Sequence, residues 1–160
     1  MLGGVEMTFW GAYKAFWKNY VNFSGRASRK EYWFVFLWNV IIGSVLGLGL
    51  GVSLVGMAAS AFSYGNGVTA SLVFSILFGG ILGVYALVAF IPLLSLAVRR
   101  FHDVGLSGWW YGGLYIANLM LGFCFDGWFW SLLSFVISVV ILVISALPTD
   151  YLKKSANLSE

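Results

Sequence analysis

Charged side chains are scarce in this 160-residue sequence, and that scarcity excludes a water-soluble fold. Asp, Glu, Lys and Arg make up 9% of the residues, and hydrophobic residues make up 61%. A soluble globular domain has about 25% charged residues, and a domain of this size exposes much of its surface to water. The polar side chains here are too few to cover such a surface. The composition therefore predicts an integral membrane protein.

Cysteine and histidine are also nearly absent, with one of each in the chain. Cys124 has no internal partner for a disulfide, and a single Cys with His102 is too small a set for a Cys/His metal site. We therefore expect neither a metal nor a cofactor. The net charge of +3 is too small to indicate a nucleic-acid partner. The first twenty residues lack the uninterrupted apolar stretch of a cleavable signal peptide, so we expect the first membrane helix to direct insertion.

Four long apolar runs fill most of the chain, at about residues 33–59, 68–98, 109–125 and 128–147. A helix needs about 20 apolar residues, at 1.5 Å each, to cross ~30 Å of hydrocarbon. The first two runs exceed that length and can tilt or project, whereas the third is short. The runs predict an all-α, polytopic fold with four transmembrane helices.

The basic residues orient these four spans. They lie before the first run, between the second and third, and after the fourth: Lys14, Lys18, Arg26, Arg29, Lys30, Arg99, Arg100, Lys153 and Lys154. The connections at 63–67 and 126–127 carry none. All nine then share one side of the membrane, which the positive-inside rule identifies as the cytoplasm. We therefore expect a cytoplasmic segment at 1–31, a transmembrane domain at 32–148, and a short cytoplasmic tail at 149–160.

Residues 5–23 differ from the spans because polar residues interrupt their aromatic ones. Lys14, Lys18 and Asn19 lie among aromatic and apolar residues at helical spacing: Phe9, Trp10, Tyr13, Phe16, Trp17, Tyr20 and Val21. This pattern predicts an N-terminal amphipathic helix in the cytoplasmic interface of the membrane. The alternative is a helix that packs on neighbouring protein.

A first motif, F-S-G-R-A-S-R-K-E-Y-W at residues 23–33, precedes the first span. Ser28 and Glu31 have the spacing of a capping box, so we expect Ser28 to cap the first transmembrane helix and Glu31 to bond back to it. Gly25 suits a turn before that helix. The Tyr32–Trp33 pair is typical of headgroup depth.

A second motif, R-R-F-H-D-V-G-L-S-G-W-W at residues 99–110, connects the second and third spans. Gly105 permits a backbone conformation closed to other residues. Ser107 is placed to cap the third transmembrane helix. The double Trp again indicates the interface.

Together the two motifs resemble the DUF805 family of small bacterial inner-membrane proteins, in motif order and in the layout of the spans. The resemblance implies a four-helix protein of the bacterial inner membrane, and it implies no activity, since the family is named for its unknown function. This sequence departs from the family pattern at Leu106, where a basic or polar residue is usual. The tail from Pro148 also lacks the Asn/Tyr/Gly-rich ending of the family.

Both motifs lie on the cytoplasmic face in the four-span arrangement, where their polar residues can gather. One interpretation is structural: carboxylates pair with arginines and tie the loops together. The other is a binding site for an anionic phospholipid headgroup or an acidic partner protein. The candidate binding residues are Arg26, Arg29, Arg99, Arg100 and His102. The candidate structural and capping residues are Ser28, Glu31, Asp103 and Ser107.

Small and amide side chains are expected to pack the spans together. Glycines recur four apart, which lets helix backbones approach closely, at Gly43, Gly47, Gly51, Gly79, Gly83, Gly108 and Gly112. Asn39 and Asn118 are the strongest polar side chains inside the spans. We expect them to form hydrogen bonds between helices.

The favoured function is a non-enzymatic inner-membrane component whose partners are membrane lipid, a membrane protein or further copies of itself. No catalytic residue is assigned, because His102, Asp103 and Ser107 crowd into one tight turn and rarely aim at a common centre from there. The alternative is a small oligomeric transporter or channel, although no ionisable residue lies well inside a span. An enzyme acting on a lipid headgroup is a third hypothesis.

Overall fold

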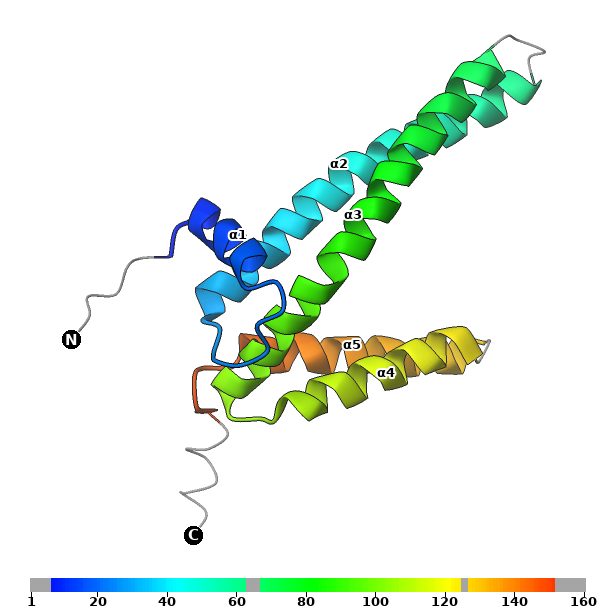
Figure 1. The fold of residues 1–160 in the computed structure, drawn as a ribbon. Helices are drawn as coiled ribbons and strands as arrows, with labels where there is room; N and C mark the ends of the chain where they lie inside the picture. The colour runs from blue at the N-terminus through cyan, green and yellow to red at the C-terminus, as the bar shows by residue number, and fades with distance from the viewer. Residues whose placement is uncertain (1–6, 63–66, 125–126, 152–160) are drawn as a thin grey trace. The chain divides into compact units, whose positions relative to one another are not determined.

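The computed structural model describes residues 7–62, 67–124 and 127–151, and these residues form an all-helical fold (Figure 1). The helices are α1 (Phe9–Lys18), α2 (Arg29–Phe62), α3 (Gly67–Val104), α4 (Gly108–Cys124) and α5 (Trp128–Ala146). The all-α prediction is confirmed. The predicted connections at 63–67 and 126–127, and the predicted tail at 149–160, lie mostly outside the described residues.

Three helices in the described part of the chain are long and apolar enough to cross a membrane. The candidate spans are Arg29–Ala61, Val68–Val104 and Trp128–Ala146. They coincide with the first, second and fourth apolar runs. The third run forms α4, whose 17 residues leave it out of this set.

The chain divides into two compact units. The first contains the residues up to Val35 and those from Pro92 onward, and the second contains Phe36–Ile91. The division cuts α2 and α3, and Pro92 lies within α3 without ending it.

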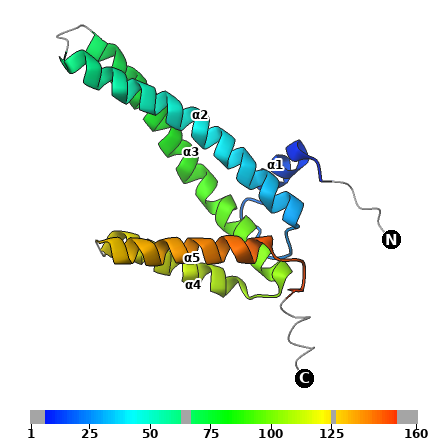
Figure 2. The same ribbon diagram turned by 180° about the vertical axis from the view of Figure 1, so that it is seen from behind.

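The second unit is a helical hairpin in which α2 and α3 lie side by side (Figures 1 and 2). Two hydrogen bonds between side chains join them. Ser75 Oγ donates to Ser53 Oγ at 2.9 Å, and the hydroxyl of Tyr85 donates to Asn39 Oδ1 at 2.9 Å. The predicted interhelical bond of Asn39 is confirmed.

Close packing in this hairpin centres on Gly49, which the four-residue glycine spacing did not single out. A Cβ atom at Gly49 would lie 2.4 Å from the ring of Phe78. The predicted glycines at 43, 47 and 51 of α2 instead face open space. The glycine spacing therefore indicated that α2 packs closely against another helix, but it did not indicate which face of α2 meets α3.

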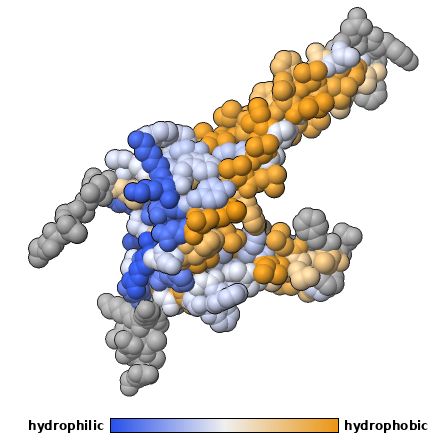
Figure 3. Space-filling model, viewed as in Figure 1, coloured by the Kyte–Doolittle hydropathy of each residue, from blue (hydrophilic) through white to orange (hydrophobic). Residues whose placement is uncertain are grey.

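Apolar side chains cover the outside of the hairpin (Figure 3). Leu87 is 77% exposed and Leu48 is 69% exposed. A surface this apolar is compatible with lipid as the surrounding solvent, and the helical backbone satisfies its own hydrogen bonds there. The hairpin is therefore a membrane-embedded element.

In the first unit, α4 and α5 also lie side by side (Figures 1 and 2). Asn118 Nδ2 donates to Ser138 Oγ at 2.8 Å, and Ser134 Oγ donates to Asn118 Oδ1 at 2.5 Å. The predicted interhelical role of Asn118 is confirmed.

The segment predicted to be helical between 5 and 23 contains α1. Thr8 caps it, because its side chain accepts the N–H of Gly11 at 3.0 Å. Ala12 and Phe16 are buried, one helical turn apart. The ring of Phe9 meets that of Phe34 edge to face at 5.7 Å between centroids, so α1 is fastened to the start of α2.

Candidate functional site

The two sequence motifs meet in the first unit, where α3 ends and α2 begins. The N–H of Ala27 donates to the carbonyl of Arg99 at 3.2 Å, which joins the motifs through their backbones. The segment after α5 joins them, since the N–H of Asp150 donates to the carbonyl of Asp103 at 2.8 Å. We call this three-way meeting of segments the polar junction; its charged members are Arg26, Glu31, Arg99, Arg100, Asp103 and Asp150.

Arg100 is the centre of the polar junction, and it is fully buried. Its Nε donates to the carbonyl of Ser145 at 3.0 Å, and its Nη2 donates to the carbonyl of Leu147. Its Nη1 donates to the carbonyl of Ala27 at 3.4 Å and to the carboxylate of Asp103. The last carbonyls of a helix have no partner within it, so this cation satisfies and stabilises the end of α5. One side chain thus fastens three segments.

Arg99 and Glu31 form a second buried pair. Arg99 Nη1 lies 3.2 Å from Glu31 Oε1, and the two side chains are 5% and 8% exposed. Ser28 Oγ accepts the N–H of Glu31 at 3.2 Å, which caps α2. The carboxylate of Glu31 was expected to return to the backbone N–H of Ser28, but it bonds to Arg99, whose full positive charge attracts a carboxylate more strongly than a neutral backbone N–H does. Nε and Nη2 of Arg99 are buried and have no partner among the described residues.

The segment after α5 contributes two polar residues that the sequence interpretation missed. Thr149 Oγ1 donates to Asp103 Oδ2 at 2.8 Å. Arg26 Nη1 donates to Asp150 Oδ2 at 2.8 Å, with about half of each side chain exposed. The hydrogen bond and the negative charge of Asp150 raise the pKa of Arg26. The one available signal was the predicted four-span topology, in which these residues follow the last span on the side that carries the arginines.

The turn between α3 and α4 has the geometry of a Schellman motif. Gly105 has a φ of 103°, a conformation that costs glycine little. The N–H of Gly105 donates to the carbonyl of His102 at 3.2 Å, and the N–H of Leu106 donates to that of Phe101 at 3.0 Å. This pattern ends α3 at Val104.

Ser107 follows, and α4 begins directly after it at Gly108. The carbonyl of Ser107 accepts the N–H of Trp110 at 3.0 Å. A Cβ atom at Gly108 would lie 2.6 Å from Cγ1 of Val98 and 3.0 Å from Nε2 of His102. Gly108 therefore lets the start of α4 lie directly against the end of α3.

A polar pocket of about 450 Å³ opens between the first motif and this turn. Its lining comes from both motifs: Gly25, Arg26, His102, Gly105, Leu106 and Ser107. The five candidate binding residues therefore separate. Arg26 and His102 line the pocket, Arg99 and Arg100 are buried in the polar junction, and Arg29 is exposed at the start of α2.

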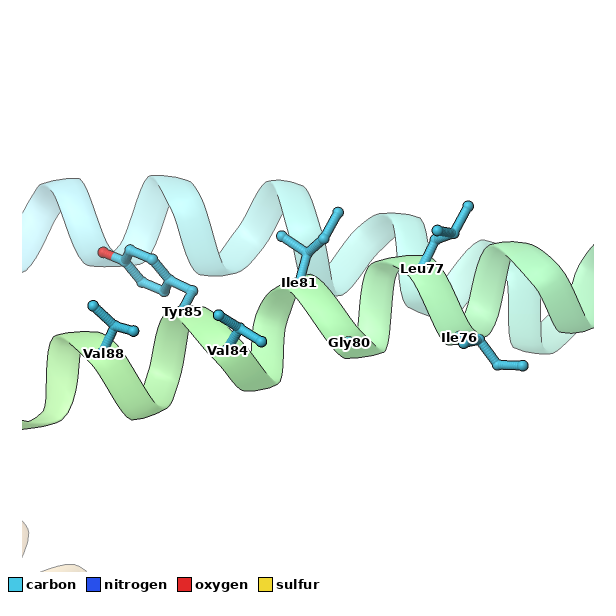
Figure 4. A pocket seen from close by; sticks show the side chains of 7 residues that line it. All are labelled: Ile76, Leu77, Gly80, Ile81, Val84, Tyr85 and Val88. Atoms are coloured by element: carbon cyan, nitrogen blue, oxygen red, sulfur yellow. The ribbon is translucent and has the colours of Figure 1, made fainter.

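A larger groove, of about 560 Å³, runs along α3 in the second unit (Figure 4). Its lining is almost entirely aliphatic, and its one hydroxyl, on Tyr85, is bonded to Asn39. Such a lining offers no group for chemistry. Within the described part of the chain, no three His, Cys, Asp or Glu side chains gather in an arrangement that could hold a metal ion.

The apolar helices and the buried polar junction define a helical, integral membrane protein. The chain belongs to the DUF805 family, "Protein of unknown function", whose family model matches residues 20–155. The resemblance seen in the two motifs is thereby confirmed. The relatives in this family include proteins of the inner membrane, and the present chain is a multi-pass protein of that class.

Two relatives in Escherichia coli K12 illustrate the similarity. The chain is 37% identical over 98 residues to "Inner membrane protein YhaI", a match that covers 58% of this chain and 61% of that protein. It is 37% identical over 93 residues to "Inner membrane protein YhaH", covering 58% of this chain and 63% of the relative. The chain thus spans less than two thirds of the length of these relatives. No solved structure matches it.

Proposed function

We propose that this chain is a non-enzymatic inner-membrane protein with four spans and both ends in the cytoplasm, whose cytoplasmic face binds anionic phospholipid. In this proposal the buried arginines hold the helices together, and the exposed basic residues contact lipid. The proposal depends on the topology, on the position of α1 and on the division of the arginines.

The four-span topology is supported by the pairing of α4 with α5. At 1.5 Å per residue, the 17 residues of α4 extend about 26 Å, near the lower limit for a span. Asn118 bonds to α5 from within α4, so the two helices are joined at membrane depth. If α4 did not cross, Lys153 and Lys154 would lie on the opposite side from the arginines, against the positive-inside rule.

The position of α1 at the membrane interface is supported by its two faces. Ala12 and Phe16 face the protein. Trp10 is 54% exposed, and Nζ of Lys14 lies 5.8 Å from the centroid of its ring. Exposed aromatic and basic side chains on one short helix suit the headgroup region, where the ring meets acyl chains and the ammonium meets phosphate.

The observation that carries the proposal is the division of the arginines. Arg99 and Arg100 are buried and bonded to the protein. Arg26, Arg29 and Lys30 are exposed within one short segment around the start of α2. Basic residues close to a membrane span attract anionic lipid, and only an exposed set is available to do so.

A non-enzymatic role is supported by the arrangement around Asp103. Its carboxylate accepts bonds from Arg100 and Thr149. This carboxylate therefore holds the polar junction together, whereas a catalytic triad would use it to orient His102.

Spin-labelled phosphatidylglycerol and phosphatidylcholine in reconstituted vesicles test the proposal. The protein is expected to immobilise the anionic lipid preferentially, and the preference is expected to fall as salt is raised. Replacement of Arg26, Arg29 and Lys30 together by Gln is expected to abolish it. Equal immobilisation of the two lipids by the wild type would refute the proposal.

A further inference from the structure

We propose that the polar pocket and an adjoining apolar pocket form one site for a single anionic phospholipid, with the phosphate in the polar pocket and one acyl chain along α4. This inference rests on the proposed function, because it assumes that the face carrying both motifs meets lipid headgroups. It goes further by assigning a defined site in place of a diffuse basic surface.

The polar pocket contains donors that the protein leaves unused. Arg26 uses only Nη1, in its bond to Asp150, so Nε and Nη2 have no partner among the described residues. The side chains of His102 and Ser107 likewise form no hydrogen bond within the described part of the chain. Three donor side chains therefore line one cavity of about 450 Å³. A phosphate group offers the acceptor oxygens that such donors bind.

The start of α4 adds to the positive potential of this pocket. Ser107 lines the pocket and immediately precedes α4, a helix of 17 residues. The first N–H groups of a helix have no acceptor within it and carry partial positive charge. Gly108 and Trp109 supply such groups here, and phosphate binds well at a helix N-terminus.

The apolar pocket, of about 440 Å³, begins where the polar pocket ends. Ser107 lines both, and the rest of the apolar pocket is formed by Trp109, Trp110, Gly113 and Leu114 of α4. Trp109 is 88% exposed and Trp110 is 63% exposed. Exposed Trp side chains are typical of the membrane interface. A ligand that fills both pockets must be polar at one end and apolar at the other.

The charge of the site favours a phosphodiester lipid. One arginine, already shared with Asp150, suits a ligand with a single negative charge. Phosphatidylglycerol has that single charge, and one of its acyl chains can fill the apolar pocket along α4. A free phosphate would fill only the polar pocket, and an acidic peptide would leave the apolar one empty.

Native mass spectrometry of the full-length protein in detergent tests the site, with dioleoyl phosphatidylglycerol, dioleoyl phosphatidylcholine and glycerol phosphate as probes. Arg26→Gln is expected to weaken phosphatidylglycerol binding about tenfold, the loss of one charged hydrogen bond. Its matched control is Arg29→Gln, which removes an exposed arginine of the same segment that lines neither pocket. Because that variant keeps the arginine of the polar pocket, it is expected to weaken phosphatidylglycerol binding less than Arg26→Gln does.

The apolar pocket has its own matched pair of variants on α4. Gly113→Leu places a side chain in the pocket, whereas Gly112→Leu does so outside it, and a Cβ at either glycine meets open space. Only Gly113→Leu is expected to weaken lipid binding. Asp150→Asn breaks the same ion pair as Arg26→Gln but keeps the arginine, so it is expected to bind at least as tightly as the wild type.

The outcomes separate the two proposals. No preference of the wild type for phosphatidylglycerol over phosphatidylcholine would refute the proposed function and this site together. A preference that Arg26→Gln and Arg29→Gln reduce equally, with no effect of Gly113→Leu, would overturn the site and leave the proposed function standing. Glycerol phosphate binding as tightly as the lipid would also overturn it, in favour of a soluble phosphate ligand. Loss of binding in Asp150→Asn would assign the effect of Arg26→Gln to the ion pair and overturn the site.

Discussion

Replacement of Arg100 by Met tests the central structural role assigned to the polar junction. The guanidinium is fully buried and bonded to Ser145, Leu147, Ala27 and Asp103. Met keeps much of the side-chain volume but donates to none of them. Breaking a buried pair by removing one partner costs about 3–5 kcal/mol, because the remaining charge is left without compensation. We expect Arg100→Met to lower the free energy of unfolding by an amount in that range.

Part of this loss is expected to return when Asp103 is also made neutral. Arg100→Met combined with Asp103→Asn removes the unpaired carboxylate, so the double variant should be less destabilised than the two single effects added together. Arg100→Lys keeps the positive charge, but one ammonium cannot reach all the acceptors that surround the planar guanidinium of Arg100. We therefore expect Arg100→Lys to be destabilising as well.

Unfolding of the purified protein by SDS in mixed micelles, followed by circular dichroism, measures these changes. Arg29→Met is the control, because Arg29 is exposed and a surface substitution of this kind changes stability by about 0.5 kcal/mol or less. If Arg100→Met is no more destabilising than Arg29→Met, the polar junction does not hold the three segments together.

Three further predictions concern the helices, two from their contacts and one from the proposed topology. Gly49→Ala forces a methyl group against the ring of Phe78 and is expected to destabilise the hairpin by about 1–3 kcal/mol; Gly47→Ala, which faces open space, is its control in the same unfolding assay. Asn118→Leu removes the bonds to α5 and is expected to cost about 1 kcal/mol, measured in the same way. Cys124, exposed at the end of α4, is expected to react with a membrane-impermeant maleimide in intact cells, because the proposed four-span topology places it in the periplasm.

Each of these predictions has a result that contradicts it. Equal stability of Gly49→Ala and Gly47→Ala would show that α2 and α3 do not meet at Gly49. If Asn118→Leu has the same free energy of unfolding as the wild type, the hydrogen bonds of Asn118 do not stabilise the pairing of α4 with α5. Labelling of Cys124 only after the membrane is permeabilised would place Cys124 on the cytoplasmic side and contradict the proposed topology. Ser24→Cys in a Cys124→Ser background serves as the control, since we expect that position to be labelled only after permeabilisation.

The four long helices could be predicted because each of them follows an apolar run. Each of the four apolar runs became a helix, with ends within a few residues of the predicted ones except where α2 and α3 extend further, as at Arg29 and Val104. Those extensions carry four of the charged residues of the polar junction, namely Glu31, Arg99, Arg100 and Asp103. Hydropathy ends a span at the first charges, whereas a helix continues until its backbone is stopped, here by Gly105.

The division of the arginines could not be predicted from the sequence. In the sequence, Arg26, Arg99 and Arg100 all lie near the ends of apolar runs, and nothing distinguishes them. All three were therefore predicted to be candidate binding residues. Their different roles arise from long-range contacts, since the carbonyls that bind Arg100 come from the end of α5, 45 and 47 residues further along the chain. No local pattern encodes which arginine those carbonyls meet.

The same limit applies to the packing glycines. A four-residue spacing identifies a smooth helix face, but the facing residue decides where the close approach occurs. The bulk of Phe78 makes Gly49 the point of contact, and Gly43, Gly47 and Gly51 lie on another face.

The composition of the phospholipid that co-purifies with the protein from its own membrane tests the account most directly. Lipid extracted from the purified wild type is expected to be enriched in anionic phospholipid relative to the membrane, and the variant with Arg26, Arg29 and Lys30 replaced by Gln is expected to show no enrichment while remaining folded. A wild type whose lipid has the composition of the membrane would contradict the account.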